Sequence, residues 1–228
     1  MHISIKNATR EVSKKPVFSS VNLEIHSGQV LAVVGMKGSG KSSLLRAIAG
    51  AVSLSSGEIT YDGALYEADS DSISRSFLLL TSPPPFLSEE TVLRNISLFL
   101  TQYQKMDDAK IGDKISTALD TFDLKEQFES RVEELSSEQA IRLAFLIYSV
   151  IEPGVGIFED LNPSEIADRK NHGTIIYSAR AVNLNSDELA ADQICLLNRG
   201  QVYATGTPGE IRRLAETDHL VASLTGLG

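Results

Sequence analysis

The chain has 228 residues, of which 42% are hydrophobic, so it can enclose one large core or two modest ones. Its net charge of −9 argues against general nucleic-acid binding through a basic face, and a single cysteine, Cys195, excludes an internal disulfide framework, which suits the cytosol. The longest nearly apolar stretch, residues 143–151, is much shorter than the roughly 18 residues that a membrane span needs. If the protein serves a membrane, another polypeptide or a removed segment therefore crosses it.

The N-terminal segment alternates strand and turn patterns. Residues 1–6 (MHISIK) alternate apolar and polar side chains, which is typical of an edge strand, and they show no signal-peptide pattern. Gly28 marks a turn, and the apolar run of residues 30–34 (VLAVV) then predicts a buried strand.

The loop after this strand, residues 35–42 (GMKGSGKS), matches the phosphate-binding pattern G-x-x-x-x-G-K-[ST]. Residues 43–49 have apolar side chains at helical spacing, and Gly50 is placed to end that helix. Glycines let the backbone wrap closely around phosphate oxygens, and a helix N-terminus adds free N–H groups and a positive dipole end. We expect Lys41 to reach the β- and γ-phosphates and the Ser42 hydroxyl to hold Mg²⁺.

Strand, glycine-rich turn and helix together predict a nucleotide site. The alternative is an ordinary glycine-rich turn with a solvated lysine, and the flanking strand and helix favour the site. The candidate cofactor-binding residues of this region are Gly35, Lys37, Gly38, Ser39, Gly40, Lys41, Ser42 and Ser43.

The remaining pattern predicts an α/β core, residues 1–85 and 152–228, with a helical insert at residues 86–151. Further core strands are predicted within residues 55–63 and at 77–80, 155–158, 175–177, 194–197 and 201–204, the last two joined by the turn at 198–200. Helical stripes in the insert are formed by Val92, Leu93, Ile96 and Phe99, and by Ile111, Ile115, Leu119 and Phe122. A helix near residues 208–216 and a short tail end the chain. Cys195 is expected in a buried strand.

Several further segments carry the motifs of one family. They are residues 56–59 (SGEI), 85–87 (PFL) with 91–96 (TVLRNI), 135–139 (LSSEQ), 191–194 (ADQI), and 197–202 (LNRGQV) with 206–208 (GTP). Together with the loop at 35–42, they make the chain resemble the nucleotide-binding domain of ATP-binding cassette (ABC) transporters nearly end to end. The resemblance implies an α/β P-loop NTPase fold of the ABC ATPase type, with an N-terminal β-subdomain and a helical subdomain insert. It also implies ATP and Mg²⁺ as ligands.

The resemblance also implies partners. Two such domains pair head to tail, and each ATP lies between the P-loop of one and the LSGGQ helix of the other. The expected partners are a second ABC nucleotide-binding domain, from the same or a different chain, and a membrane-spanning transporter domain or subunit, with no nucleic acid. The expected location is peripheral, at the cytoplasmic face of a membrane.

The acidic pair after the strand at 155–158 departs from the family pattern, which is Asp for Mg²⁺ and then Glu for the attacking water. Counting along the chain places Glu159 first and Asp160 second, so both are catalytic candidates, and Glu159 with Ser42 is the candidate metal pair. The side chain of Asp160 is one methylene shorter than the glutamate that the family uses as this base. A slip of one residue makes Asp160 the metal ligand and leaves Leu161 at the catalytic position. Weak hydrolysis is expected in either register, and the plain alternative is two acids exposed at a strand end.

Three more family positions differ. The glutamine that senses the metal falls at Pro83, which has no side-chain donor or acceptor. The histidine near the γ-phosphate is replaced within residues 178–180, where Arg180 is either a phosphate-stabilising cation or a surface arginine. The adenine-stacking aromatic aligns near Val12, and no Tyr or Phe lies in residues 1–17, so adenine loses its usual stack.

Two segments that the family uses in dimer contacts are also altered. In the LSSEQ segment, Ser136 and Gln139 predict a capping box for the following helix, and the same two residues are candidate ATP contacts across a dimer. Both interpretations stay open. Glu138 replaces a glycine there and places a negative charge near phosphate, which is unfavourable. Residues 161–173 are just long enough for a parallel crossover, so the dimer-contacting loop is expected to be trimmed.

These patterns predict an ATP-binding subunit or domain of an ABC transporter. It binds MgATP at the P-loop and couples nucleotide-dependent dimerisation to a membrane partner, with weak or regulatory hydrolysis. The alternative is a soluble, non-transport ABC protein that acts as an ATP-dependent assembly or regulatory switch. A P-loop kinase or GTPase of another family is disfavoured by the C-terminal motifs at residues 191–208.

Overall fold

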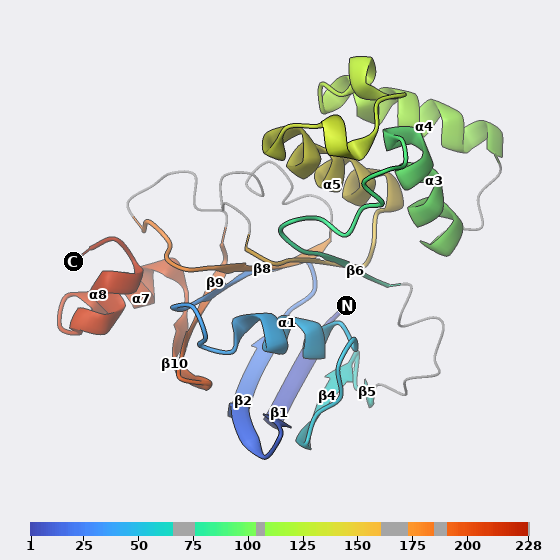
Figure 1. Cartoon of the computed structure of the whole chain (residues 1–228). Helices are drawn as coiled ribbons and strands as arrows, with labels where there is room; N and C mark the ends of the chain where they lie inside the picture. The colour runs from blue at the N-terminus through green and yellow to red at the C-terminus, as the bar shows by residue number, and fades with distance from the viewer. Residues whose placement is uncertain (66–75, 104–107, 161–172, 185–190, 228) are drawn as a thin grey trace. The chain divides into compact units, whose positions relative to one another are not determined.

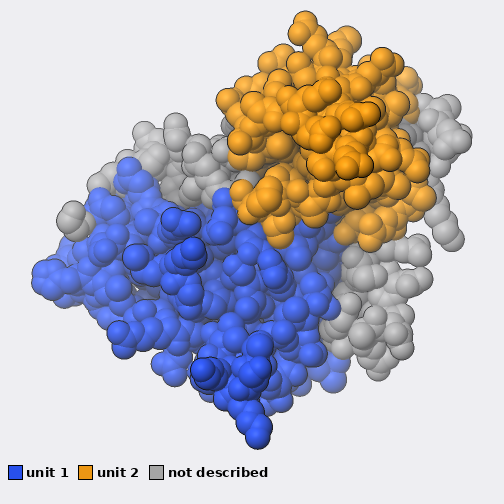
Figure 2. All heavy atoms as spheres, in the orientation of Figure 1, with its two compact units in different colours: residues 1–79, 154–228 blue, residues 80–153 orange. Residues whose placement is uncertain are grey.

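The computed structural model describes residues 1–65, 76–103, 108–160, 173–184 and 191–227 (Figure 1). The chain forms two compact units, the first made of residues 1–79 and 154–228 and the second of residues 80–153 (Figure 2). The first unit contains two β-sheets and the P-loop, whereas the second is built from helices. The helical insert predicted at residues 86–151 falls within the second unit.

One sheet of the first unit is antiparallel, with the strand order β2-β1-β4-β5. Its strands are β1 (Ile3–Val12), β2 (Lys15–Ile25), β4 (Ser56–Tyr61) and β5 (Ala64–Leu65). The prediction of an edge strand at residues 1–6 is wrong, because β1 lies between two neighbours and Ile5 pairs with both Leu23 and Ile59. Alternation identified one buried face, on which Ile5 is 1% exposed, but alternation does not say how many strands flank it.

The other sheet is six-stranded, in the order β10-β9-β3-β8-β7-β6. Its strands are β3 (Val30–Val34), β6 (Phe77–Leu80), β7 (Val155–Phe158), β8 (Thr174–Ala179), β9 (Gln193–Asn198) and β10 (Gln201–Gly206). The strand β3 runs parallel to β8 and β9, β7 runs parallel to β8, and β9 and β10 form the predicted antiparallel hairpin. All five residues of β3 are buried, which explains its continuous apolar sequence. The predicted strands of this sheet are confirmed, and Cys195 is buried in β9 as expected.

Three helices belong to the first unit: α1 (Lys41–Ile48), α7 (Pro208–Ala215) and α8 (His219–Leu224). The first two are confirmed, and Gly50, with a φ of +70°, follows the end of α1 as predicted. The helix α8 lies where the sequence predicts only a tail. Its N-cap Asp218 accepts hydrogen bonds from Leu220 N and Val221 N, and Val221 is fully buried. Six residues are too few to show a helical period.

The second unit contains α3 (Val92–Tyr103), α4 (Asp108–Thr121) and α5 (Ser137–Ile151), with short 3₁₀ turns at Lys125–Gln127 and Val132–Glu134. The predicted stripes are buried at Val92, Ile96, Ile115, Leu119 and Phe122, and the side chain of Ile111 lies outside the described part. The buried amide of Asn95 accepts from Leu87 N (2.8 Å) and donates to Leu87 O (3.0 Å), which fastens the preceding loop to α3. Within the described residues, no helix has the length and apolarity needed to cross a membrane.

Candidate nucleotide-binding site

The candidate site begins where β3 ends and α1 begins. Gly35 N donates a hydrogen bond to Ala179 O at the end of β8 (3.2 Å), and Ser39 N donates to Met36 O (3.1 Å). The first bond anchors the loop to the neighbouring strand, and the second closes a tight turn within it. The carboxyl ends of the parallel strands β3 and β8 therefore hold the start of the loop, where open α/β sheets place their ligands.

Two glycines of the loop have no room for a side chain. A Cβ on Gly35 would collide with the carbonyl oxygen of Leu197, and a Cβ on Gly40 would lie 2.6 Å from the carbonyl oxygen of Val17. Gly40 also has a φ of +99°, which disfavours any residue other than glycine. Gly38 has a φ of +82° but faces open space. The loop thus packs tightly on its inner side and is open on its outer side.

The turn between β9 and β10 holds the loop from a second direction. Gly200 N donates to Ser39 O (2.9 Å), and Gly200 O accepts from Ser19 N of β2 (2.8 Å). A Cβ on Gly200 would lie 2.6 Å from Val17 O, so this close approach needs glycine. The sequence predicts the turn at residues 198–200, but the turn alone gives no sign that it supports the P-loop.

Lys41 folds its side chain back over the loop. Its Nζ donates to Gly35 O (2.6 Å) and Met36 O (3.1 Å), and the residue is 6% exposed. Burial lowers the pKa of this ammonium, the charge of Asp160 raises the pKa, Arg180 lowers it and Glu159 raises it. The ammonium is therefore held at the loop, within the field of the groups at the ends of β7 and β8.

The N-terminus of α1 is open. Its N-cap is Gly40, which supplies no side-chain oxygen, and its first turn has no acidic residue. Among the described residues, no group accepts a hydrogen bond from the N–H of Lys41, Ser42 or Ser43. The buried hydroxyl of Ser39 also has no hydrogen-bond partner among the described residues. Unpaired donors at the positive end of a helix, beside a buried ammonium, are what an anionic ligand such as a phosphate chain satisfies.

The two acids after β7 have different surroundings. Glu159 is 8% exposed, and its Oε2 accepts from both Nε and Nη2 of Arg46 on α1, each at 3.3 Å. Asp160 is exposed and has a φ of +57°, and its N–H donates to Ser178 Oγ on β8 (3.0 Å). The pairing of Arg46 with Glu159 joins residues that are 113 positions apart, and no sequence pattern predicts it.

The residues that replace the family's histidine also lie at this end of the sheet. Ser178 is fully buried and accepts from Asp160 N, whereas Arg180 is exposed just after β8. Arg180 influences the pKa of Lys41, so its charge acts at the P-loop even though its exposure is that of a surface arginine. Val12, near the expected adenine position, is 50% exposed at the end of β1.

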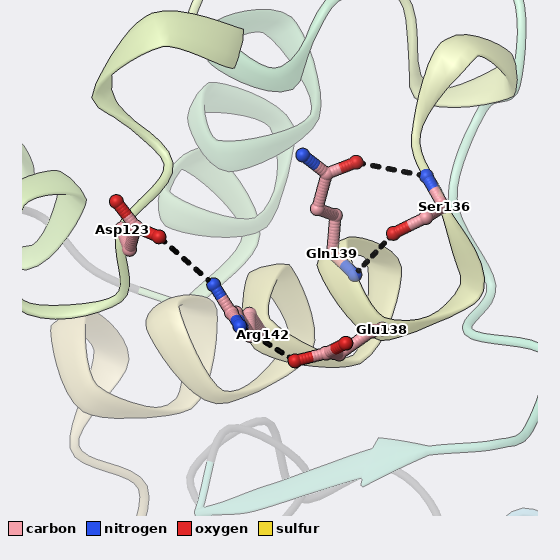
Figure 3. A network of polar contacts seen from close by, with 5 residues as sticks. All are labelled: Asp123, Ser136, Glu138, Gln139 and Arg142. Carbon is pink, nitrogen blue, oxygen red and sulfur yellow. Dashed lines mark hydrogen bonds and ion pairs between the residues drawn. The ribbon is translucent and has the colours of Figure 1, made fainter.

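The LSSEQ segment lies in the second unit, at the start of α5 (Figure 3). The predicted capping box is confirmed: Gln139 N donates to Ser136 Oγ (3.2 Å), and Ser136 N donates to Gln139 Oε1 (2.9 Å). Arg142 of α5 forms ion pairs with Glu138 of the same helix (2.5 Å) and with Asp123, which follows α4 (3.1 Å). The start of α5 is thus stabilised by local contacts in which Ser136 Oγ and Gln139 Oε1 act as acceptors.

Two further positions considered in the sequence are Pro83 and Leu161. Pro83 also lies in the second unit, and its carbonyl oxygen accepts from Thr81 Oγ1 (2.9 Å). Residues 161–172, which include Leu161 and almost all of the predicted crossover, lie outside the described residues.

The residues present fit a nucleotide with its magnesium. The glycine cradle, the unpaired N–H groups and Lys41 match a chain of phosphates. Mg²⁺ takes oxygen ligands and is usually held by one or two protein groups together with substrate phosphates. The Ser42 hydroxyl and one carboxylate at the end of β7 are of that kind. No cluster of three or more His, Cys, Asp or Glu that could hold a metal occurs in the described residues.

Comparison with known proteins agrees with this geometry. A family model described as "ABC transporter" matches residues 18–160. The chain is 25% identical to the spermidine/putrescine import ATP-binding protein PotA of Fusobacterium nucleatum, over 98% of this chain and 62% of PotA. It is 29% identical to the sulfate/thiosulfate import ATP-binding protein CysA of Thermosynechococcus vestitus, over 92% of this chain and 66% of CysA. The chain therefore spans somewhat less than two thirds of each relative.

Solved structures show the same fold. The ADP conformation of MJ1267, an ATP-binding cassette of an ABC transporter, superposes with a TM-score of 0.79 at 18% identity, covering 98% of both chains. An ATP-binding subunit of an ABC transporter gives a TM-score of 0.78 at 23% identity, covering 94% of this chain and 93% of that one. The fold class is therefore the P-loop NTPase fold of ABC cassettes. Because the family model covers well over half of the chain, including β3, the P-loop, α1 and the acidic pair, the chain belongs to the ABC transporter family.

Proposed function

We propose that this chain is the ATP-binding component of an ABC importer and that it binds MgATP at residues 35–43. The observation that carries the proposal is the open N-terminus of α1 beside the buried ammonium of Lys41. When phosphate binds, Lys41 exchanges its contacts with loop carbonyls for phosphate oxygens, and the N–H groups of the first turn gain acceptors. Ser42 contributes its hydroxyl to Mg²⁺.

The names of two relatives support import as the direction of transport. PotA and CysA are both import ATP-binding proteins, and they align with more than nine tenths of this chain. This chain would then act at the cytoplasmic face of a membrane, with a membrane-spanning subunit and a second nucleotide-binding domain as partners. The same relatives favour a transporter component over a soluble assembly or regulatory switch. Co-purification with a membrane protein distinguishes the two, and a chain that assembles only with soluble partners would support the switch.

Slow hydrolysis is part of the proposal. Asp160 has a shorter reach than the glutamate expected at its position, Arg180 stands in place of a histidine, and Pro83 offers no side-chain polar group. We expect turnover well below about 1 s⁻¹, the low end for enzymes. Fast hydrolysis that Asp160→Asn abolishes would contradict a weak site.

Nucleotide binding is tested with Lys41→Ala in calorimetric titrations with MgATP. Loss of a charge-assisted contact with phosphate should weaken binding about 10- to 100-fold. Lys6→Ala is the matched control, because Lys6 is an exposed lysine on β1 of the same unit. Wild-type protein that binds no ATP, or equal affinity in Lys41→Ala, would refute the proposed site.

A further inference from the structure

The P-loop is held at two points by main-chain contacts with distant parts of the first unit. At its start, Gly35 N donates to Ala179 O at the end of β8 (3.2 Å). Further along, Ser39 O accepts from Gly200 N in the turn between β9 and β10 (2.9 Å). Phosphate binding depends on how the N–H groups of the loop are directed, so it depends on where the end of β8 and this turn are held.

The segment that follows β8 is fastened by the C-terminal helices. Val182 N donates to Leu224 O (3.0 Å), and Leu184 N donates to Thr225 O (3.2 Å), both at the end of α8. The guanidinium of Arg212 on α7 donates to Leu184 O. Val182 and Leu184 are each 3% exposed, so leaving their N–H groups without these acceptors would be costly. The chain just beyond β8 is therefore positioned by α8.

A side-chain hydrogen bond joins α8 to β10. The hydroxyl of Tyr203 on β10 donates to Asp218 Oδ2 (2.5 Å). The other carboxylate oxygen of Asp218 accepts from Leu220 N (2.9 Å) and Val221 N (3.1 Å), which caps α8. Since β10 begins directly after Gly200, one carboxylate connects the helix behind β8 to the hairpin that holds the other end of the P-loop.

The helix α8 is short enough to open locally. It has only six residues, and isolated helices of that length are unstable in water, so it depends on its cap and on the burial of Val221 and Leu224. When α8 opens, the N–H groups of Val182 and Leu184 lose their acceptors and the chain beyond β8 is freed. The nucleotide must then order the P-loop itself, and that ordering reduces its affinity.

We propose that residues 200–225, here called the C-terminal support, hold the P-loop in the shape that binds phosphate, and that opening of α8 lowers the affinity for MgATP. The bond between Tyr203 and Asp218 closes the support. This inference rests on the proposed nucleotide site and adds the residues that position it. Tyr203 and Asp218 are positioning residues, because they act through α8, β8 and the turn. Any event that stabilises or unfolds α8 therefore changes nucleotide binding.

The first test measures the dissociation constant of MgATP by calorimetry. Asp218→Ala removes both the cap and the tyrosine bond and should weaken binding about fivefold. Asp218→Asn keeps a residue that caps helices well, so it should recover part of the affinity and lose only about twofold, as should Tyr203→Phe. The double variant of Tyr203→Phe and Asp218→Asn should be no weaker than either single variant, because both remove the same bond.

A matched control separates positioning from general stability. Ser4→Ala removes a buried hydroxyl that donates to Glu24 Oε1 (2.6 Å) in the antiparallel sheet. It should lower Tm by a few degrees, as Asp218→Ala does, but leave the affinity for MgATP within experimental error of wild type. An equal loss of affinity in Ser4→Ala would show that general stability, and not the support, sets the affinity.

The second test uses the wild type and the reciprocity of coupling. If opening of α8 weakens MgATP binding, MgATP must oppose that opening by the same factor. Hydrogen exchange followed by NMR should therefore slow several-fold at the N–H groups of Val182 and Leu184 in saturating MgATP. The N–H of Ser55, bonded to Thr9 O in the antiparallel sheet, is the reference and should not change. A helix that only stabilised the fold would show no such response.

The outcomes distinguish this inference from the proposed function. Wild-type affinity in Asp218→Ala, or exchange at Val182 and Leu184 that MgATP does not slow, would overturn the inference while leaving ATP binding in place. The exchange measurement decides the matter even where Asp218→Ala does not fold, because it needs no variant. Absence of MgATP binding by the wild type would instead refute the proposed function, and the inference with it.

Discussion

The N-termini of α1 and α5 carry the two motifs by which this family is recognised, and they differ in how their backbone donors are satisfied. At α1 the N-cap is a glycine, the first turn has no acid, and a buried ammonium lies beside it. At α5 the capping box of Ser136 and Gln139 provides acceptors for two backbone N–H groups, and Glu138 adds an acid to the first turn. The first end has no side-chain cap, whereas the second is capped by its own side chains.

This difference affects two expected sets of nucleotide contacts separately: those of the P-loop and those of the LSSEQ segment. The uncapped, positively polarised end of α1 offers unpaired N–H donors to phosphate, so the proposed binding takes these contacts from the first unit. At the capped end of α5, phosphate would compete with the side-chain oxygens of the capping box, and the charge of Glu138 is expected to oppose it. Degeneracy of the site stays a prediction from the sequence; the structure has a glycine cradle at the P-loop and a capping box at the LSSEQ segment.

The largest expected effect on stability comes from a substitution at Gly40, the N-cap of α1. Gly40→Ala should destabilise the protein by about 3 kcal/mol or more, because the new Cβ meets Val17 O and the φ of +99° is strained for alanine. Gly38→Ala is the matched control: it has a similar positive φ but open space around it, and should cost about 1 kcal/mol. Urea unfolding followed by circular dichroism measures both, and equal losses would mean that the close approach to β2 does not matter.

A smaller effect is expected from opening the cap of α5. Ser136→Ala removes the acceptor of Gln139 N and should cost about 1 kcal/mol of stability. The neighbouring Ser137→Ala changes an exposed residue that does not form the cap and should stay within about 0.5 kcal/mol of wild type. Thermal unfolding compares the two, and a neutral Ser136→Ala would contradict a closed helix end.

The smallest effect concerns the charge at the same helix end. Glu138→Gln removes an exposed pair with Arg142 and a favourable acid at the helix N-terminus, so Tm should fall by only about 1–2 °C. The loss should shrink in 1 M NaCl, where such pairs are screened. Asp123→Asn, which removes the other partner of Arg142, is the comparison. A rise in Tm would show that the charge is unfavourable even without bound phosphate.

The parts predicted well from the sequence depend on neighbours along the chain. The apolar run of β3, the glycines of the loop and the capping box of α5 involve residues a few positions apart, so their patterns are visible locally. The short helix α8 is the local element that was missed, because its formation depends on burying Val221 against the rest of the unit.

The errors and omissions elsewhere involve distant partners. The position of β1 between β2 and β4 depends on which strands pair, and alternation within β1 is the same at an edge or in the interior. The support of the P-loop by Gly200 joins segments 161 residues apart, since it runs from Ser39 to Gly200. In the sequence these contacts correspond only to an alternating pattern and a glycine, and neither identifies the distant partner.

The sequence by itself determined that a phosphate-binding loop lies between a buried strand and a helix, because glycine, lysine and serine at fixed spacing dictate a local backbone and its donors. Only the tertiary structure decided which contacts the acids after β7 make. Glu159 and Asp160 are adjacent and chemically alike, yet Arg46 of α1 takes the first and Ser178 of β8 anchors the second. Their different environments arise from burial and long-range charge pairing, which chain order does not encode.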